Sequence, residues 1–379
     1  MARRPLAAAA ALAIAGGASL GWTIARKLTA PVGPRTFGLV VRGVEVEGDC
    51  QLLLLDRTRD TEASGVYNLW FERGGWAQLA EGAQDRGVGQ VARVVTGSSP
   101  GLRPRAGDRV SWSGIYYATP ADAGLDAREV FIDTPAVPAP AWRVDGDLST
   151  WAIHIHGLGS PRAGTLRGVR VASEIGLTSL VVSYRNDGEG PTVGSGRSTL
   201  GAAEVEDIEA AIGYAVRRGA ERIVLFGWSM GAAIALQVAH RSDYARLVAG
   251  LVLDSPVLNL VEVIKANCKR AGIPRSAGLL AVPWVSVGLF SRLIGLPACI
   301  PVREFDWVTR ADDLSVPTLI LHGSRDDSAP IGVSLALAEQ RTDLVQMETF
   351  EAGHTMAWNS DPERWRTRVS AWLSARLSG

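Results

Sequence analysis

Two patterns of hydrophobic and polar positions divide the chain near residue 150. Between Thr36 and Asp133 the apolar runs are short, often alternating, and broken by Gly, Asp and Pro, as in "FGLVVRGVEV" and "DRVSWSGIYY". Such runs predict β-strands joined by tight turns. We therefore expect a β-rich N-terminal domain over residues 36–140, which ends in the Pro-rich connector Thr134–Trp142. No polar cluster in this part indicates chemistry.

From Thr150 onward, continuous apolar runs alternate with helical patterns. The runs are "TWAIHIHG", "LTSLVVSY", "ERIVLFG", "LVAGLVLDSP", "VPTLILHG" and "LVQMETFEAG". Strands of this kind, separated by helices, predict an α/β domain over residues 141–379 in which a mostly parallel sheet is covered on both faces. An insert of about residues 257–312 interrupts the alternation and contains the apolar run "LLAVPWVSVGLF", which Pro283 cuts. The insert is expected to form a short lid.

The N-terminus has a separate pattern. "MARR" precedes an uncharged run from Leu6 to Ile24, and Arg26 and Lys27 follow it. The run reaches the length that spans a bilayer, although its Ala and Gly content makes insertion weak. We expect residues 1–30 to be a single anchor at the cell membrane, or else a secretory signal peptide cleaved near "ALAIA", with secretion of the rest. Positive charges flank the apolar run on both sides, so they leave the orientation of this segment in the membrane open.

Composition narrows the function classes. The chain has 379 residues, 47% hydrophobic and 21% charged, which suffices for one large and one smaller folded domain. Lys and Arg balance Asp and Glu at 39 each, so no global charge attracts nucleic acid. The cysteines Cys50, Cys268 and Cys299 show no CxxC spacing, which leaves a Cys268–Cys299 bridge open but indicates neither a zinc site nor a disulfide scaffold. We expect no metal and no cofactor.

The stretch "VLFGWSMGAAIAL" is the strongest chemical signal. Gly227-Trp228-Ser229-Met230-Gly231 lies between a predicted buried strand and a predicted helix. A strand that turns sharply into a helix strains the backbone of its central residue and exposes that side chain above the sheet, near the helix N-terminus. In this setting Ser229 is predicted to be a nucleophile rather than a small residue that fills a bend.

A nucleophilic serine needs a base, and the chain has five histidines. His154, His156 and His322 stand at the ends of predicted strands, where a structural or supporting role is expected. His240 lies too far along the helix that follows Ser229 to turn back toward it. His354, in "EAGHTMAWN", follows the last strand in a Gly-containing loop and is therefore the predicted base.

The base in turn needs an orienting carboxylate. "LHGSRDDSAP" places Asp326 and Asp327 just after a strand, and only one of two adjacent side chains can point at the imidazole. We favour Asp326 and keep Asp327 and Asp254, at the end of the preceding strand, as alternatives. The order Ser229, Asp326, His354 is the one expected for a nucleophile on this kind of turn.

A reacting carbonyl also needs backbone donors for its developing negative charge. The N–H of Met230 is one by position. The other is expected from "HGLGSPRAG", where Gly157 and Gly159 allow the backbone to approach closely and Leu158 is the best placed donor. This glycine-rich loop lacks GxGxxG and GKS/GKT, so the pattern gives little support to a nucleotide site.

Taken in order, "HGLG", "GWSMG", "HGSRDDSAP" and "GH" resemble the α/β-hydrolase superfamily. The similarity covers about Thr150 to Gly379. "SYRNDGEGP" and "AGHTMAWN" resemble actinobacterial α/β-fold hydrolases that carry an N-terminal hydrophobic segment and an extra N-terminal domain. The resemblance implies the same nucleophile, acid, base and oxyanion donors. It implies no particular substrate. Ala329 stands where valine is usual, a conservative departure.

The sequence thus predicts a serine hydrolase that cleaves a small, apolar carboxylic ester through an acyl-enzyme. Trp228 and, from the insert, Trp284 and Phe290 are predicted to line the substrate site, although the two insert residues could equally pack the lid on the core. "GWSMG" also resembles the prolyl-oligopeptidase and dienelactone-hydrolase-like branches, which leaves a serine peptidase as an alternative. A further alternative is a non-catalytic binding protein on the same scaffold. The pattern does not indicate an oligomeric state.

Overall fold

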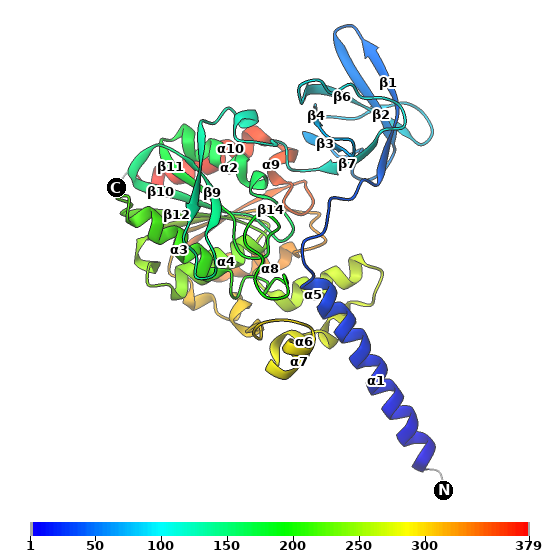
Figure 1. Ribbon diagram of the computed structural model, residues 1–379, viewed down its shortest axis with the longest axis vertical. Coiled ribbons are helices and arrows are strands. Elements are labelled where there is room, and N and C mark those ends of the chain that lie inside the picture. Colours follow the sequence, from blue (N-terminus) through cyan, green and yellow to red (C-terminus); the bar gives the residue numbers. More distant parts are fainter. Residues whose placement is uncertain (1–2, 378–379) are drawn as a thin grey trace.

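The architecture comprises a larger sheet covered by helices, a smaller N-terminal sheet and one projecting helix (Figure 1). The computed structural model describes residues 3–377, with side chains described from residue 15. Helix α1 (Arg3–Leu28) extends away from both sheets (Figure 1). Met1 and Ala2, with which the predicted membrane segment begins, lie outside the described residues, as do the last two.

The larger sheet has eight strands in the order β15-β14-β13-β12-β10-β11-β9-β8. Strands β10 to β15 pair in parallel, whereas β9 runs antiparallel to both β11 and β8. Every residue of β11 and β14 is buried, as expected for strands covered on both faces. The bounds are β8 (Ala127–Ile132), β9 (Ala139–Val144), β10 (Asp147–Ile155), β11 (Leu177–Val182), β12 (Arg222–Trp228), β13 (Val248–Asp254), β14 (Thr318–Gly323) and β15 (Val345–Phe350).

Helices cover both faces of this sheet. Side chains alternate along β10, so that Trp151 and Ile153 join one hydrophobic cluster with α3 and α4, and Ala152 joins another with α2 and α10. The predicted α/β fold class is confirmed. The helices are α2 (Leu166–Glu174), α3 (Val205–Val216), α4 (Met230–Arg241), α8 (Ile331–Gln340), α9 (Ala357–Ser360) and α10 (Pro362–Leu377), with short 3₁₀ turns η1 (Ala121–Ala123), η2 (Arg162–Thr165) and η3 (Ala245–Leu247).

The N-terminal sheet is a small antiparallel barrel. Its order is β2-β1-β7-β3-β4-β6-β5, and an additional β2–β6 pairing closes the ring. Alternate residues point inward and form a separate core that includes Leu53, Leu69 and Val110, each fully buried. The predicted β-rich N-terminal part is confirmed. Its strands are β1 (Leu39–Glu47), β2 (Cys50–Asp56), β3 (Tyr67–Phe71), β4 (Trp76–Leu79), β5 (Gln84–Asp85), β6 (Gln90–Ser98) and β7 (Arg109–Ser113).

One predicted boundary differs from the structure. The stretch Thr134–Trp142 is not a connector between domains, because β8 and β9 on either side of residues 133–138 pair with each other and belong to the larger sheet. The change from barrel to α/β part therefore falls between β7 and β8. Proline suits the first residues of a strand as well as a linker, so composition could not separate the two.

The insert and the C-terminal half of α1 share one hydrophobic cluster. A Cβ on Gly21 of α1 would lie 2.1 Å from the carbonyl oxygen of Leu280, so only glycine permits this close approach. Ala25 of α1 is fully buried. The insert contains α5 (Leu260–Arg270), η4 (Arg275–Leu280), α6 (Val282–Ser286), α7 (Gly288–Leu293), η5 (Val302–Phe305) and η6 (Ala311–Asp313).

Within residues 3–377, no helix combines the length and the apolar character needed to cross a membrane. The transmembrane helix expected from the N-terminal pattern is therefore not found in this part of the chain.

Candidate active site

Ser229 occupies a strained turn between β12 and α4. Its φ of 52° and ψ of −112° are rare for a residue with a side chain. A Cβ on Gly227 would lie 2.5 Å from the Cα of Ala232, and one on Gly231 would lie 2.1 Å from the carbonyl oxygen of Ile155. Both glycines are thus needed for the turn, which places the serine at the carboxyl edge of the sheet as the sequence predicts.

His354, in the loop after β15, contacts Ser229 and Asp326 at once. The Nε2 atom of His354 lies 2.8 Å from the Oγ of Ser229, and its Nδ1 atom lies 2.7 Å from an Oδ of Asp326. In this arrangement the serine hydroxyl donates to Nε2, while the Nδ1–H donates to the carboxylate. The structure therefore brings together three predicted residues that come from three separate loops.

The two alternative acids are placed elsewhere. Asp327 is half exposed and lies 3.6 Å from Arg59 of the barrel part. Asp254 is buried and accepts a hydrogen bond from Trp365, with an Oδ–Nε1 distance of 3.1 Å. Burial raises the pKa of Asp254, although the charge of Arg167 opposes this shift. Of the three candidates, Asp326 is the one that contacts the imidazole.

The surroundings of Asp326 keep its carboxylate charged. Burial by itself would raise its pKa, but hydrogen bonds with His322 and His354 outweigh this and hold the pKa well below its ordinary value. One carboxylate oxygen also accepts the backbone N–H groups of Ser328 and Ala329, at 2.9 and 2.8 Å. A fixed anion of this kind orients the imidazole.

The remaining histidines have other partners. His322 contacts Ser334 and the carbonyl of Ala329, and its Nε2 lies 3.3 Å from an Oδ of Asp326, so it helps to hold this carboxylate. His156 lies 3.0 Å from Asp187, and His240 packs edge-on against Trp307. His154 is fully buried, and burial lowers its pKa to about 3.

The two predicted backbone donors flank the serine. Met230 is the first residue of α4, so its N–H has no acceptor within the helix. Leu158 lies in the loop after β10, where the Cα of Gly157 comes so close to the serine that an added Cβ would be 3.2 Å from the Ser229 Cβ. Among the described residues, no acceptor bonds the N–H of Leu158. Both donors thus remain available beside the serine hydroxyl.

A cavity of about 260 Å³ opens onto these groups. One side comes from the α/β part, including Ser229, His354 and Met356. The opposite side comes from the barrel, through the end of β7 and the two residues after it. No pattern in the sequence marks these barrel residues, because they carry no group typical of catalysis. They are Trp112, Ser113, Gly114 and Ile115.

The three residues predicted to bind substrate have different positions. Trp228 is buried and lines this cavity. Trp284 and Phe290 do not line it; their rings contact each other with centroids 5.2 Å apart, and Trp284 packs against α1 at Gly21. The alternative that these two aromatic residues pack the insert is the one that the contacts favour. An apolar run cannot by itself distinguish the two roles.

One buried residue joins the barrel to the loop that carries His354. The side-chain amide of Asn359 donates to the carbonyls of Val66 and Gly114, at 2.8 and 3.0 Å. Its oxygen accepts from Arg167 at 2.8 Å, and the same guanidinium donates to the carbonyl of Thr355. Asn359 therefore links the barrel, through Arg167, to the residue next to His354.

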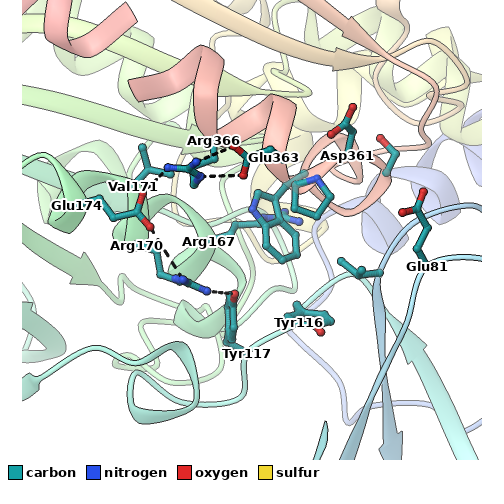
Figure 2. A pocket seen from close by; sticks show the side chains of 14 residues that line it. Glu81, Tyr116, Tyr117, Arg167, Arg170, Val171, Glu174, Asp361, Glu363 and Arg366 are labelled. Atoms are coloured by element: carbon teal, nitrogen blue, oxygen red, sulfur yellow. Dashed lines mark hydrogen bonds and ion pairs between the residues drawn. The ribbon is translucent and has the colours of Figure 1, made fainter. Parts of the chain in front are cut away.

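A larger cavity of about 890 Å³ lies between the barrel and the α/β part (Figure 2). Its arginines already have partners: Arg170 donates to Tyr117, and Arg366 pairs with Glu363 and Glu174. The lining contains neither Ser229 nor His354. Its size does not make it the site of the chemistry.

Comparison with known families agrees with this geometry. A family model described as the alpha/beta hydrolase family matches residues 152–368. The chain belongs to the alpha/beta hydrolase family. A second model, for a domain of unknown function designated DUF8805, matches residues 40–113, which form the barrel. No curated protein matches the chain.

Several solved structures share the fold. An esterase from Pyrococcus furiosus has 20% sequence identity and a TM-score of 0.54, over 68% of this chain and 96% of that one. Est1E from Butyrivibrio proteoclasticus, with ferulic acid bound, has 18% identity and a TM-score of 0.51, over 66% and 100%. A membrane phospholipase A, described as a bacterial virulence factor, has 19% identity and a TM-score of 0.50, over 68% and 88%. At these identities the likeness shows a common fold.

Proposed function

We propose that the protein is a serine hydrolase that cleaves carboxylic esters through an acyl-enzyme. The observation that carries this proposal is the continuous hydrogen-bonded chain from Ser229 through His354 to Asp326, with the serine on a strained turn. A buried anion, an imidazole with both nitrogens engaged and a partly buried serine hydroxyl that lines a cavity form the arrangement that activates serine toward a carbonyl carbon.

The residues act in two half-reactions. The Ser229 Oγ attacks the ester carbonyl while Nε2 of His354 takes the hydroxyl proton, and Asp326 stabilises the resulting imidazolium. The N–H groups of Leu158 and Met230 stabilise the negative charge on the carbonyl oxygen. The intermediate then expels the alcohol, which receives the proton from His354. A water molecule next attacks the acyl carbon while Nε2 of His354 takes its proton. The bond between this carbon and Oγ then breaks, His354 returns the proton to the Ser229 Oγ, and the carboxylic acid leaves.

The substrate proposed is a small-molecule ester with apolar groups. The cavity at Ser229 is modest in volume and is lined by the apolar side chains of Trp228, Ile115 and Met356. The names of two structural neighbours, an esterase and a phospholipase, agree with ester chemistry on this fold.

The alternatives have weaker support. Peptidases of the prolyl-oligopeptidase-like branch carry a propeller of repeated blades, whereas the described N-terminal part here is a closed barrel. A non-catalytic binding protein would not require the strained turn or the aligned imidazole.

The test is hydrolysis of p-nitrophenyl esters by the wild-type chain and by Ser229→Ala, with Ser173→Ala on α2 as the matched control. We expect ester turnover by the wild type and the control, and a loss of at least 10³-fold in kcat in Ser229→Ala. If the folded wild type hydrolyses no ester, the proposal is wrong. Faster cleavage of a prolyl p-nitroanilide than of any ester would favour the peptidase.

A further inference from the structure

A second, apolar groove adjoins the cavity at Ser229. It has a volume of about 390 Å³ and lies between the end of α1 and the end of α5, the first helix of the insert. Most of its lining is aliphatic, and Ile24, Ile264 and Cys268 are buried. The lining residues are Ile24, Lys27, Leu28, Leu158, Ile264, Asn267, Cys268, Arg270, Ala271 and Ile273.

Two contacts connect this groove to the reacting groups. Leu158 lines both the groove and the cavity at Ser229, and its side chain is 42% exposed although it is apolar. On the other side, Asn267 of the groove donates to Ser328, whose N–H bonds the Asp326 carboxylate. The groove therefore adjoins the loop after β10 through Leu158 and lies beside the loop that carries Asp326.

The chemistry of the ester decides which group points toward the groove. When a carbonyl carbon stands at the Ser229 Oγ, its oxygen faces the N–H groups of Leu158 and Met230. The acyl chain and the alcohol leave the same carbon in two different directions. Two surfaces are available to these groups: the groove, which shares Leu158 with the cavity, and the barrel residues Ser113 and Gly114, which line the cavity itself. A flexible hydrocarbon chain gains most by entering the groove, because aliphatic side chains dominate its lining.

We propose that the groove between α1 and α5 binds the linear aliphatic acyl chain of the ester. This assignment rests on the proposed function and makes α1 part of the substrate site, through Ile24 and Leu28. It also gives the exposed Leu158 a role, as the surface over which the chain passes from the serine to the groove.

The first test fills the groove. Ala271 is exposed and lines it, so Ala271→Trp adds volume without removing a core side chain. Ala298→Trp, at an exposed site of the same insert outside the groove, is the matched control. We expect the kcat/KM ratio of p-nitrophenyl octanoate to p-nitrophenyl acetate to fall at least tenfold in Ala271→Trp, since each lost methylene contact corresponds to about fourfold, ~0.8 kcal/mol. The ratio should stay at the wild-type value in Ala298→Trp.

The second test concerns α1. Leu28→Ala should lower the same octanoate-to-acetate ratio by about fourfold or more, whereas Leu20→Ala, at an exposed site outside the groove on the same helix, should leave it unchanged. Ratios that stay constant in both Ala271→Trp and Leu28→Ala would overturn the assignment. The assignment would also be overturned if the two variants lowered kcat/KM only for acetate esters of long alcohols and not for octanoate esters. The groove would then hold the alcohol instead of the acyl chain.

A binding measurement separates this inference from the proposed function. Octanoate is titrated calorimetrically into Ser229→Ala, which cannot turn over, and into the same chain with Ala271→Trp added. We expect the second substitution to weaken octanoate binding at least tenfold. Tenfold weakening together with no ester hydrolysis by the wild type would retain the groove and reject the proposed function. Equal binding to both chains together with active wild type would reject the groove alone.

Discussion

The two sides of the cavity at Ser229 are built in different ways. The α/β side presents charged and hydrogen-bonded groups on a strained backbone, with His354 held between the serine and Asp326. The barrel side presents the end of β7 and the two residues after it, Trp112 to Ile115, which carry no titratable side chain into the cavity. This difference indicates that the chemistry belongs to one side and the shape of the site to the other. Substitutions on the two sides should therefore have separable effects.

The largest effect is expected at Asp326. Asp326→Asn removes the anion that orients His354 and should lower kcat for p-nitrophenyl acetate by about 10³- to 10⁴-fold. Asp327 is the adjacent residue and is exposed, so Asp327→Asn should keep kcat within about twofold of the wild-type value. Steady-state kinetics of both variants check this. Near-normal kcat in Asp326→Asn with a large loss in Asp254→Asn would mean that the acid is misassigned.

The pH dependence of stability should also distinguish the two sides, because all five histidines lie in the α/β part. His154 is buried and its pKa is lowered to about 3, so between pH 6.5 and 3 the unfolded state binds the additional proton. Its contribution to the free energy of unfolding is complete above pH 6.5 and is lost as the pH falls toward 3, by on the order of 4 to 5 kcal/mol.

Denaturant unfolding at several pH values checks this prediction. His154→Gln should make the decline in the free energy of unfolding between pH 6.5 and 3 less steep. His240→Gln, at an exposed position, should leave this decline as in the wild type. Identical slopes in the wild type and His154→Gln would show that His154 is not the group responsible.

Asn359 tests the connection between the two sides. Asn359→Ala removes hydrogen bonds to Val66 and Gly114 and leaves Arg167 with one fewer partner. We expect a loss of about 2 to 3 kcal/mol in the free energy of unfolding, because these groups are buried. We also expect kcat to fall about tenfold, because the loop that carries His354 is less well positioned.

A purely structural role for Asn359 would give a different result. The free energy of unfolding would fall, while kcat and its pH profile, measured well below the melting temperature, would match the wild type. Ser360→Ala, at the adjacent position, is the control.

The smallest effect is expected on the barrel side. Ile115→Ala enlarges the cavity and should change kcat/KM between esters of small and bulky alcohols by about three- to tenfold, with little change in kcat for the smallest. Val46→Ala, at an exposed position of the same barrel, should change neither. A comparison of methyl and benzyl acetates measures this. A large loss of kcat for both esters in Ile115→Ala would show that the barrel participates in the chemistry itself.

The sequence predicted the α/β side well because its chemistry depends on local patterns. The glycines around Ser229 are required by contacts shorter than 3 Å, so the turn has a signature in the chain. His354 and Asp326 each follow a buried strand, and parallel strands bring such loops to the same edge.

What the sequence missed depends on contacts between distant segments. Nothing local marks Gly114 as a wall of the cavity or Asn359 as the residue that binds it, since they are 245 positions apart. The apolar run around Trp284 and Phe290 is compatible both with lining the substrate site and with packing the insert; the two rings contact each other, and Trp284 contacts α1. The stretch Thr134–Trp142 has the composition of a linker, and only its pairing with β8 and β11 shows that it joins the larger sheet.

The most direct test of the central claim is labelling by a fluorophosphonate, which reacts with activated serines. The wild-type chain is treated with the probe, digested with trypsin and analysed by mass spectrometry. We expect one stoichiometric adduct on the peptide of residues 223–241, located at Ser229, and no adduct in Ser229→Ala or, at the same exposure time, in His354→Ala. An unlabelled Ser229 in folded wild type, or an adduct at another serine with full ester turnover, would contradict it.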